Sequence, residues 1–107
     1  MIVGEAMGRL WDVLFVGAGP AGAMAARAVA RRSASVLLID KASFPRRKVC
    51  GGCLNTVALD VLRAEGLGAL PTRLGAQPLA DLRLAIGRRR VVFRLPPMMA
   101  LSRRGIP

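Results

Sequence analysis

The run Gly17-Ala18-Gly19-Pro20-Ala21-Gly22 has the spacing G-x-G-x-x-G, in which each glycine has a separate purpose. Gly17 permits a tight turn, Gly19 lets a diphosphate approach the backbone, and Gly22 lets a helix lie close to a sheet. The first N–H groups of a helix have no intrahelical partner, and the helix dipole makes that end partly positive. The run, including Pro20 and Ala21 as the first helical residues, therefore predicts a binding site for a dinucleotide pyrophosphate.

Asp40 is the second candidate residue of this site. It follows the apolar run Ser35–Ile39, just over twenty residues after Gly17. A carboxylate at that position can accept hydrogen bonds from the hydroxyls of an adenosine ribose. The glycine spacing alone is a weak signal, but here a strand precedes it, a helix follows it and an acid closes a second strand. No G-x-x-x-x-G-K-[ST] segment accompanies it, so nucleoside triphosphate hydrolysis is not supported.

The elements that must position these residues form a β-α-β pattern. Asp12–Val16 is an apolar run long enough for one buried parallel strand. The alanine-rich segment Pro20–Arg32 predicts a helix, with proline at its start, where a missing N–H does no harm. Ser35–Ile39 predicts the second strand. The fold class indicated is α/β, with a Rossmann-like βαβ unit.

The second half of the chain predicts a loop, a helix and a hairpin. Residues 41–53 lack any helical or strand period, whereas Asn55–Glu65 has an apolar stripe, Asn55 as N-cap and Gly66 as C-cap. After a connector over Leu67–Pro78, apolar residues alternate over 82–86 and 91–95, on either side of a turn at Gly87–Arg89. We expect Pro96-Pro97 to end this hairpin and the final stretch to have no partner.

Composition excludes several classes of function. Fifteen of the seventeen basic residues are arginines and the net charge is +11, yet the arginines are scattered and only three Phe and one Trp accompany them, so nucleic-acid binding is not favoured. Two cysteines and no histidine complete neither a zinc site nor a secreted disulfide framework. No secretory leader or membrane span is apparent, which favours a cytoplasmic protein; contact with an anionic membrane surface is the alternative.

The segment Phe44–Gly52, FPRRKVCGG, placed after the glycine motif, resembles the geranylgeranyl reductase family. These are FAD-dependent oxidoreductases related to aromatic monooxygenases and flavin-dependent halogenases. The chain has every fixed position of a pattern resembling F-P-R-x-K-x-C-G-G, and the resemblance covers residues 12 to about 66. Ser102-Arg103-Arg104 looks like the next family segment, although Ile106-Pro107 replaces an apolar–acidic pair there.

The resemblance implies an amino-terminal portion of a flavoenzyme, with 12–107 as a partial FAD-binding domain. Residues 1–11 are expected to be a leader, because the fold pattern begins only at Asp12. It implies that the glycine motif holds the FAD pyrophosphate and Asp40 the adenosine ribose. It further implies an isoprenoid or other lipid substrate whose carbon–carbon double bond is reduced, with NAD(P)H as an electron donor. The remaining cofactor-binding residues that it implies are Lys41, Arg46, Lys48, Gly51, Gly52 and Arg103. Of these, Arg46, Lys48, Gly51 and Gly52 would line the isoalloxazine end of the flavin, together with Cys50 as a candidate catalytic residue. Backbone N–H groups of two glycines beside cations suit the negative charge of reduced flavin.

Cys50 keeps three interpretations open. It can be a flavin-adjacent cysteine, it can form a redox pair with Cys53, or it can be an inert buried thiol. Arg46, Arg47 and Lys48 make its surroundings electropositive. Two alternatives to a reductase also stay open: a catalytically silent dinucleotide-binding fragment, and an FAD-dependent monooxygenase or halogenase.

Overall fold

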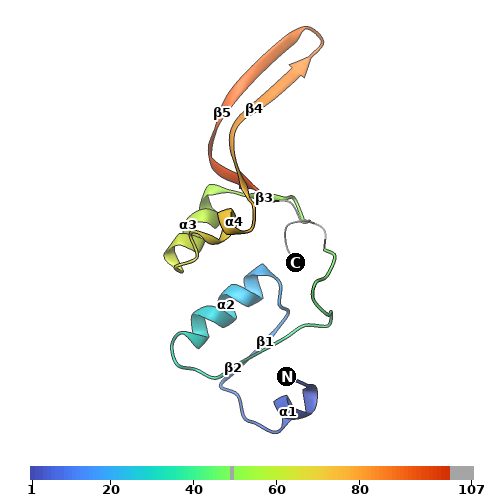
Figure 1. Ribbon diagram of the computed structural model, residues 1–107, viewed down its shortest axis with the longest axis vertical. Coiled ribbons are helices and arrows are strands. Elements are labelled where there is room, and N and C mark those ends of the chain that lie inside the picture. Colours follow the sequence, from blue (N-terminus) through green and yellow to red (C-terminus); the bar gives the residue numbers. More distant parts are fainter. Residues whose placement is uncertain (49, 102–107) are drawn as a thin grey trace. The chain divides into compact units, whose positions relative to one another are not determined.

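A computed structural model describes residues 1–48 and 50–101 of the chain (Figure 1). The chain divides into two compact units, Met1–Arg46 and Arg47–Pro107. Each unit is described by itself below. Together their elements confirm the predicted α/β class: a βαβ unit in the first, and a helix followed by a β-hairpin in the second.

The first unit is built on two parallel strands joined by a helix. Strands β1 (Val13–Val16) and β2 (Val36–Ile39) pair in register, Val13 opposite Val36 and Val16 opposite Ile39. Helix α2 (Pro20–Ala30) connects them and packs on the sheet, with proline in its first turn as predicted. The helix ends at Ala30 rather than Arg32, because Ser33 adopts a left-handed conformation (φ 65°) and donates its N–H to the Ala30 carbonyl.

Asp12 and Ser35 tie the starts of the two strands together. One oxygen of the Asp12 carboxylate accepts hydrogen bonds from the N–H and the hydroxyl of Ser35, both at 2.7 Å. The N–H of Asp12 in turn bonds to Ser35 oxygens, at 3.0 Å to the hydroxyl and 3.1 Å to the carbonyl. These bonds hold the pKa of the Asp12 carboxyl below its ordinary value, with the Ser35 N–H as the largest cause. We call this arrangement the Asp12–Ser35 clasp.

The two faces of the β1–β2 sheet differ in cover. Leu38 faces α2, since it lies next to the position of Gly22 in that helix. By strand alternation, Leu14, Val16 and Ile39 lie on the opposite face, and all three side chains are exposed. The only buried apolar residue of this unit among those described is Ala26 of α2. The core of the unit is therefore thin and made of small side chains against one face of the sheet.

The segment predicted as a leader contains a short helix. Helix α1 spans Val3–Met7, and the indole N–H of Trp11 donates to the carbonyl of Ala6 at 2.9 Å. The Arg9 guanidinium stacks over the Trp11 ring, 4.3 Å from its centroid. Trp11, the one tryptophan in the sequence, therefore reports on the first unit.

The second unit contains a helical base and a long hairpin. Helix α3 (Thr56–Ala64) begins as predicted, with the Asn55 side chain accepting a hydrogen bond from the N–H of Ala58 at 2.9 Å. It ends one residue earlier than predicted, and Gly66 (φ +74°) closes it because the N–H of Leu67 reaches back to the Leu62 carbonyl. The connector was predicted without structure but contains helix α4 (Leu70–Arg73), where Pro71 is buried.

The sheet of the second unit has the order β3-β5-β4 and is antiparallel. Its long strands are β4 (Gln77–Ile86) and β5 (Arg89–Ala100), and β3 (Cys53–Leu54) pairs with the end of β5. The hairpin predicted over 82–95 is confirmed, but both strands are longer than expected. The loop predicted over 41–53 is also one residue shorter than expected, because Cys53 belongs to β3.

The prediction that Pro96-Pro97 ends the hairpin is wrong, because β5 continues to Ala100. The prolines fall opposite a register irregularity between Leu79 and Asp81, where the ladder is already interrupted, so their missing N–H groups cost little. The final stretch also has partners, contrary to expectation: Met99 and Ala100 lie between β3 and β4. Within the described ranges, no helix is long and apolar enough to cross a membrane.

We predict that Ser35→Ala lowers the thermal midpoint of the first unit by a few degrees. The substitution removes the hydroxyl that both donates to the Asp12 carboxylate and accepts from the Asp12 N–H. Trp11 fluorescence during a melt measures the effect. The control is Ser43→Ala, at an exposed position in the loop after β2, where the midpoint should stay unchanged. Equal midpoints for both variants would show that the clasp is not stabilising.

Candidate cofactor-binding site

The glycine motif forms the turn between β1 and α2. Gly17 has φ +106°, a conformation that side chains rarely adopt, and its N–H donates to the Ile39 carbonyl at 2.7 Å. Gly19 is the N-cap of α2, in an extended conformation, and its carbonyl accepts the first helical hydrogen bond from Ala23 at 2.9 Å. The turn is thus fixed to the end of β2 on one side and opens directly into the helix on the other.

Gly22 is required by the closeness of the helix to the turn. A Cβ atom built on Gly22 would overlap the carbonyl oxygen of Gly17 and lie next to the Leu38 side chain. The sequence predicted close packing of this glycine against a sheet. The structure adds that its nearest neighbour is the backbone of the turn itself, so Gly22 sets the distance between the helix start and the end of β1.

The start of α2 presents free backbone donors. Pro20 has no N–H, and the N–H groups of Gly19, Ala21 and Gly22 precede the first helical acceptor. Within the described part of the chain, none of these three groups donates a hydrogen bond. A helix of eleven residues adds the positive end of its dipole at the same place. This donor set suits an anion such as a diphosphate.

Asp40 connects the glycine turn to the loop that follows β2. One carboxylate oxygen accepts the N–H of Ala18 and the other accepts the N–H of Ala42, each at 2.8 Å. The predicted closeness of Asp40 to the glycine turn is therefore present in the structure. A carboxylate has about four acceptor directions, so two backbone bonds leave capacity for ribose hydroxyls. That role of Asp40 stays a prediction.

The surroundings of Asp40 favour its ionised form. The N–H groups of Ala42 and Ala18 hold the pKa of this carboxyl below its ordinary value of 3.8, and the positive charges of Arg46 and Lys41 act in the same direction. Partial burial acts in the opposite direction but does not prevail. Asp40 consequently stays a carboxylate, and a hydrogen-bond acceptor, at neutral pH.

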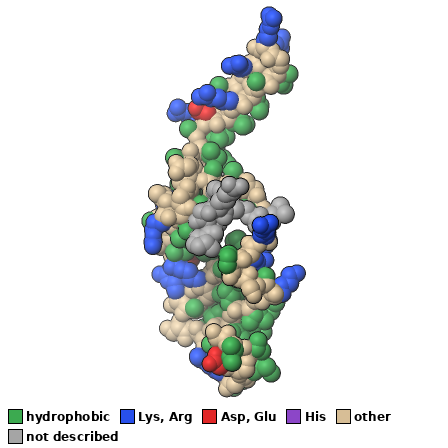
Figure 2. Space-filling model, turned by 45° about the vertical axis from the view of Figure 1, so that its right-hand side comes forward, with side chains coloured by type: hydrophobic (Ala, Val, Ile, Leu, Met, Phe, Trp, Pro, Cys, Tyr) green, Lys and Arg blue, Asp and Glu red, His purple; other side chains and the backbone are tan. Residues whose placement is uncertain are grey.

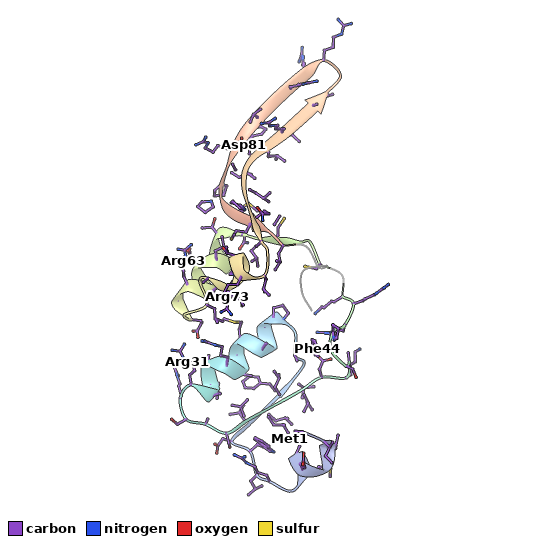
Figure 3. All side chains as sticks on the ribbon, viewed as in Figure 1. Met1, Arg31, Phe44, Arg63, Arg73 and Asp81 are labelled. Atoms are coloured by element: carbon purple, nitrogen blue, oxygen red, sulfur yellow. The ribbon has the colours of Figure 1, made fainter. Side chains whose placement is uncertain are left out.

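Arg46 lies beside Asp40, with 3.7 Å between its Nη2 and the Oδ2 of the carboxylate. Its guanidinium also stands over the ring of Phe44, 5.2 Å from the centroid; Figure 3 labels Phe44 in the segment after β2. The resemblance assigned Arg46 to the isoalloxazine end of the flavin, whereas its neighbour in the structure is the acid expected to hold the ribose. Lys41 follows Asp40 directly and is exposed.

The remaining predicted residues belong to the second unit. Lys48, Cys50, Gly51 and Gly52 precede β3, and both cysteines are exposed free thiols. The N–H of Gly52 donates to the Cys50 sulfur at 3.4 Å, and the Gly52 carbonyl accepts the N–H of Leu101. The structure thus shows a local turn in which Cys50 touches one of the two glycines. Arg103, and Val49 inside the motif, lie outside the described residues.

FAD fits the part of the site that the structure describes. The backbone N–H groups at the start of α2 can donate to its diphosphate, and the glycine turn has few side chains to block access to the backbone. The Asp40 carboxylate lies next to that turn. Sequence reasoning missed one feature, namely that Asp40 binds the backbone of Ala18 in addition to being near it. Only the parallel register, which brings residues 22 positions apart together, reveals that bond.

The family model described as FAD binding domain matches residues 11–97. The chain belongs to this family. The match covers most of the chain and includes the glycine motif, Asp40 and the hairpin. Membership agrees with the geometry of the turn and with the FAD-dependent class to which the motif FPRRKVCGG pointed.

Curated relatives match the chain over about half its length. A menaquinone reductase of Mycobacterium tuberculosis is 53% identical over 57 residues, which is 53% of this chain and 14% of the relative. A menaquinone reductase of Mycolicibacterium smegmatis is 45% identical over 64 residues, 59% of this chain and 16% of the relative. Conditioned medium factor receptor 1 of Dictyostelium discoideum is 41% identical over 58 residues, 54% of this chain and 11% of the relative. The matched part is thus a small share of each relative. No solved structure matches the chain significantly.

We predict that Gly22→Ala weakens FAD binding by about tenfold or more and destabilises the first unit by roughly 1–3 kcal/mol, because the added methyl group overlaps the Gly17 carbonyl. Flavin fluorescence titration and Trp11-detected unfolding measure the two effects. Gly4→Ala in α1 is the matched control, since an added Cβ there meets nothing within 4 Å. Normal FAD binding by the Gly22 variant would contradict the packing argument.

The stability of the first unit should fall in acid through Asp40. Its pKa is lowered by folding, so its contribution is present above the ordinary value of 3.8 and is lost as pH falls through the lower folded value. Asp40→Asn should therefore unfold more readily at neutral pH and lose part of the dependence on pH below about 5. Trp11-detected urea unfolding between pH 3 and pH 7 checks this. Asp81→Asn, on the exposed hairpin, should behave like the unchanged chain.

Proposed function

We propose that the chain binds FAD at the glycine turn and serves an FAD-dependent oxidoreductase that reduces a carbon–carbon double bond of an isoprenoid lipid. The observation that carries the cofactor part concerns three amides, on Gly19, Ala21 and Gly22, that have no partner among the described residues; they lie next to Ala18, whose N–H binds the carboxylate of Asp40. Family membership supports the same cofactor.

Two likenesses support the substrate class. The loop sequence FPRRKVCGG resembles the geranylgeranyl reductases, whose substrates are isoprenoids. Two of the relatives are named menaquinone reductases, and menaquinone is a quinone with an isoprenoid side chain. Both point to a prenylated lipid rather than a small polar molecule. NAD(P)H is the electron donor that we propose.

The residues of this chain bind and orient in this proposal. FAD, once reduced by NAD(P)H, would supply the hydride for one carbon of the double bond, and a proton would add to the other. The amides of Gly19, Ala21 and Gly22 hold the diphosphate, and Asp40 accepts from the ribose while keeping the turn in place. Gly51 supplies a backbone N–H group for the charged edge of the isoalloxazine, Gly52 lies beside it, and Lys48 adds a positive charge. Cys50 would sit beside the flavin, where its contact with the Gly52 amide orients the thiol.

A second candidate is a chain that binds the nucleotide without catalysis. The observation in its favour is the small core: only Ala26, Pro71 and Ala76 are buried among the described residues. Binding of the adenosine and diphosphate parts needs only the first unit. Reduction of a substrate also needs the flavin ring to be held and shielded from water, for which this core provides little.

Titration of FAD with the purified chain tests the proposal and separates the two candidates. We expect quenching of flavin fluorescence that ADP competes away, and a loss of about tenfold in affinity for Asp40→Asn but none for Asp81→Asn. Bleaching of the bound flavin absorbance on anaerobic addition of NADPH supports the oxidoreductase. FAD binding without bleaching supports the silent candidate, and the absence of FAD binding contradicts both.

A further inference from the structure

The register of the hairpin sorts its side chains onto two faces. Residues directly opposite each other in an antiparallel pair share a face, and successive residues alternate. Leu82 pairs with Phe93 and Leu84 with Val91, whereas Arg83 pairs with Val92 and Ala85 with Arg90. We call the first set, with Ile86, the apolar face: Leu82, Leu84, Ile86, Val91 and Phe93. The arginine face carries Arg83, Arg90 and Arg94, together with Asp81 opposite Arg94.

Every side chain of the apolar face is exposed, from 45% for Leu82 to 82% for Ile86. Five large apolar residues in one contiguous strip are unusual on a free surface and mark a place of interaction. The strip runs along the part of the hairpin between Asp81 and Arg94, which the structure shows extending beyond α3 and α4 (Figure 1). No other strand in the described part of the chain pairs with this section, because β3 reaches only Met99 and Ala100.

The same section is strongly basic. It contains five arginines and one acid, Asp81, which Figure 3 labels on the hairpin. Arg88 lies in the turn, and Arg89, the first residue of β5, pairs with Ile86, the most exposed residue of the apolar face, so one arginine stands at the end of that face. Figure 2 shows Lys and Arg side chains along the hairpin and at its tip, interspersed with hydrophobic ones. An occupant of this surface must therefore offer apolar groups and negative charge together.

We propose that this hairpin docks on the surface of an anionic lipid bilayer. The apolar face rests among the acyl-chain ends of the headgroup region, while the arginines at the tip and on the opposite face bind lipid phosphates. The outer edges of β4 and β5 carry backbone N–H and C=O groups that need water as a hydrogen-bond partner. Water is within reach in the headgroup region but not in the hydrocarbon core, so deep insertion is excluded.

Charge decides between this partner and two others. A second copy of the chain would bring two clusters of arginines together, and the chain as a whole has a net charge of +11. A nucleic acid would satisfy the arginines but leave the aliphatic strip in water, since Phe93 is the only aromatic residue of the hairpin. An anionic bilayer offers acyl chains to the apolar face and phosphates to the arginines.

Vesicle sedimentation with the full chain tests the proposal. We expect binding to vesicles of phosphatidylcholine mixed with phosphatidylglycerol and much weaker binding to phosphatidylcholine alone. Leu84→Ser on the apolar face should weaken binding several-fold, whereas Val92→Ser, equally apolar and similarly exposed on the arginine face, should not. Arg83→Gln with Arg90→Gln should weaken binding about tenfold or more, and Arg73→Gln in α4 much less.

A fluorescence measurement locates the contact without relying on affinity. In a Trp11→Phe background, tryptophan is placed at position 93 or at position 92 by Phe93→Trp or Val92→Trp. Anionic vesicles should shift the emission of the first to the blue and expose it to quenching by brominated acyl chains, and should leave the second nearly unchanged. Equal responses at both positions would overturn the docking geometry.

Other outcomes also count against the proposal. If sedimentation velocity shows dimers and Leu84→Ser abolishes them, the apolar face binds a second copy of the chain. If the chain binds duplex DNA and vesicles with equal affinity, the binding reflects only attraction between charges. The proposal does not rest on FAD binding. If the chain binds vesicles but not FAD, the membrane proposal stands. If the chain binds FAD but not vesicles, the membrane proposal is wrong and the proposed function is unaffected.

Discussion

The Asp40 carboxylate is the interaction on which the first unit depends. It bridges the N–H of Ala18 in the glycine turn and the N–H of Ala42 in the next loop, at 2.8 Å each. Those two backbone bonds hold the pKa of the group down and keep it charged. One side chain thus ties the glycine turn to the loop that follows β2.

The two ends of the parallel pair are held by the same kind of contact. At the start, the Asp12–Ser35 clasp joins the strands, and at the end the Gly17 N–H reaches the Ile39 carbonyl before Asp40 closes the turn. Two strands of four residues each offer few ladder bonds of their own. The side-chain acceptors Asp12 and Asp40 at the two ends therefore stabilise the strand pair, as further strands would do in a wider sheet.

Local rules made much of this predictable. Gly17 needs a positive φ, Gly22 leaves no room for a Cβ, and Asn55 and Gly66 cap α3, all of which follow from residue type and spacing. The juxtaposition of Asp40 with the turn also followed, because consecutive parallel strands end at one edge of a sheet.

Features that depend on partners distant in the sequence could not be predicted from local patterns. Pro96 and Pro97 usually end a strand, but here they face an interruption in β4 that no local pattern reveals. The bond from Ala18 to Asp40 and the placement of Arg46 beside that acid likewise require the fold. The length of β5 was missed because Met99 and Ala100 become strand only through β3 and β4.

The interruption between Leu79 and Asp81 divides the hairpin into a base and an arm. The base is anchored, since the Thr56 hydroxyl donates to the Pro97 carbonyl at 2.7 Å and β3 flanks Met99. At this interruption, Pro96 and Pro97 leave β5 without amide hydrogens to donate. The hairpin therefore consists of two separately paired sections, and the Thr56–Pro97 hydrogen bond fixes the joint between them to the start of α3.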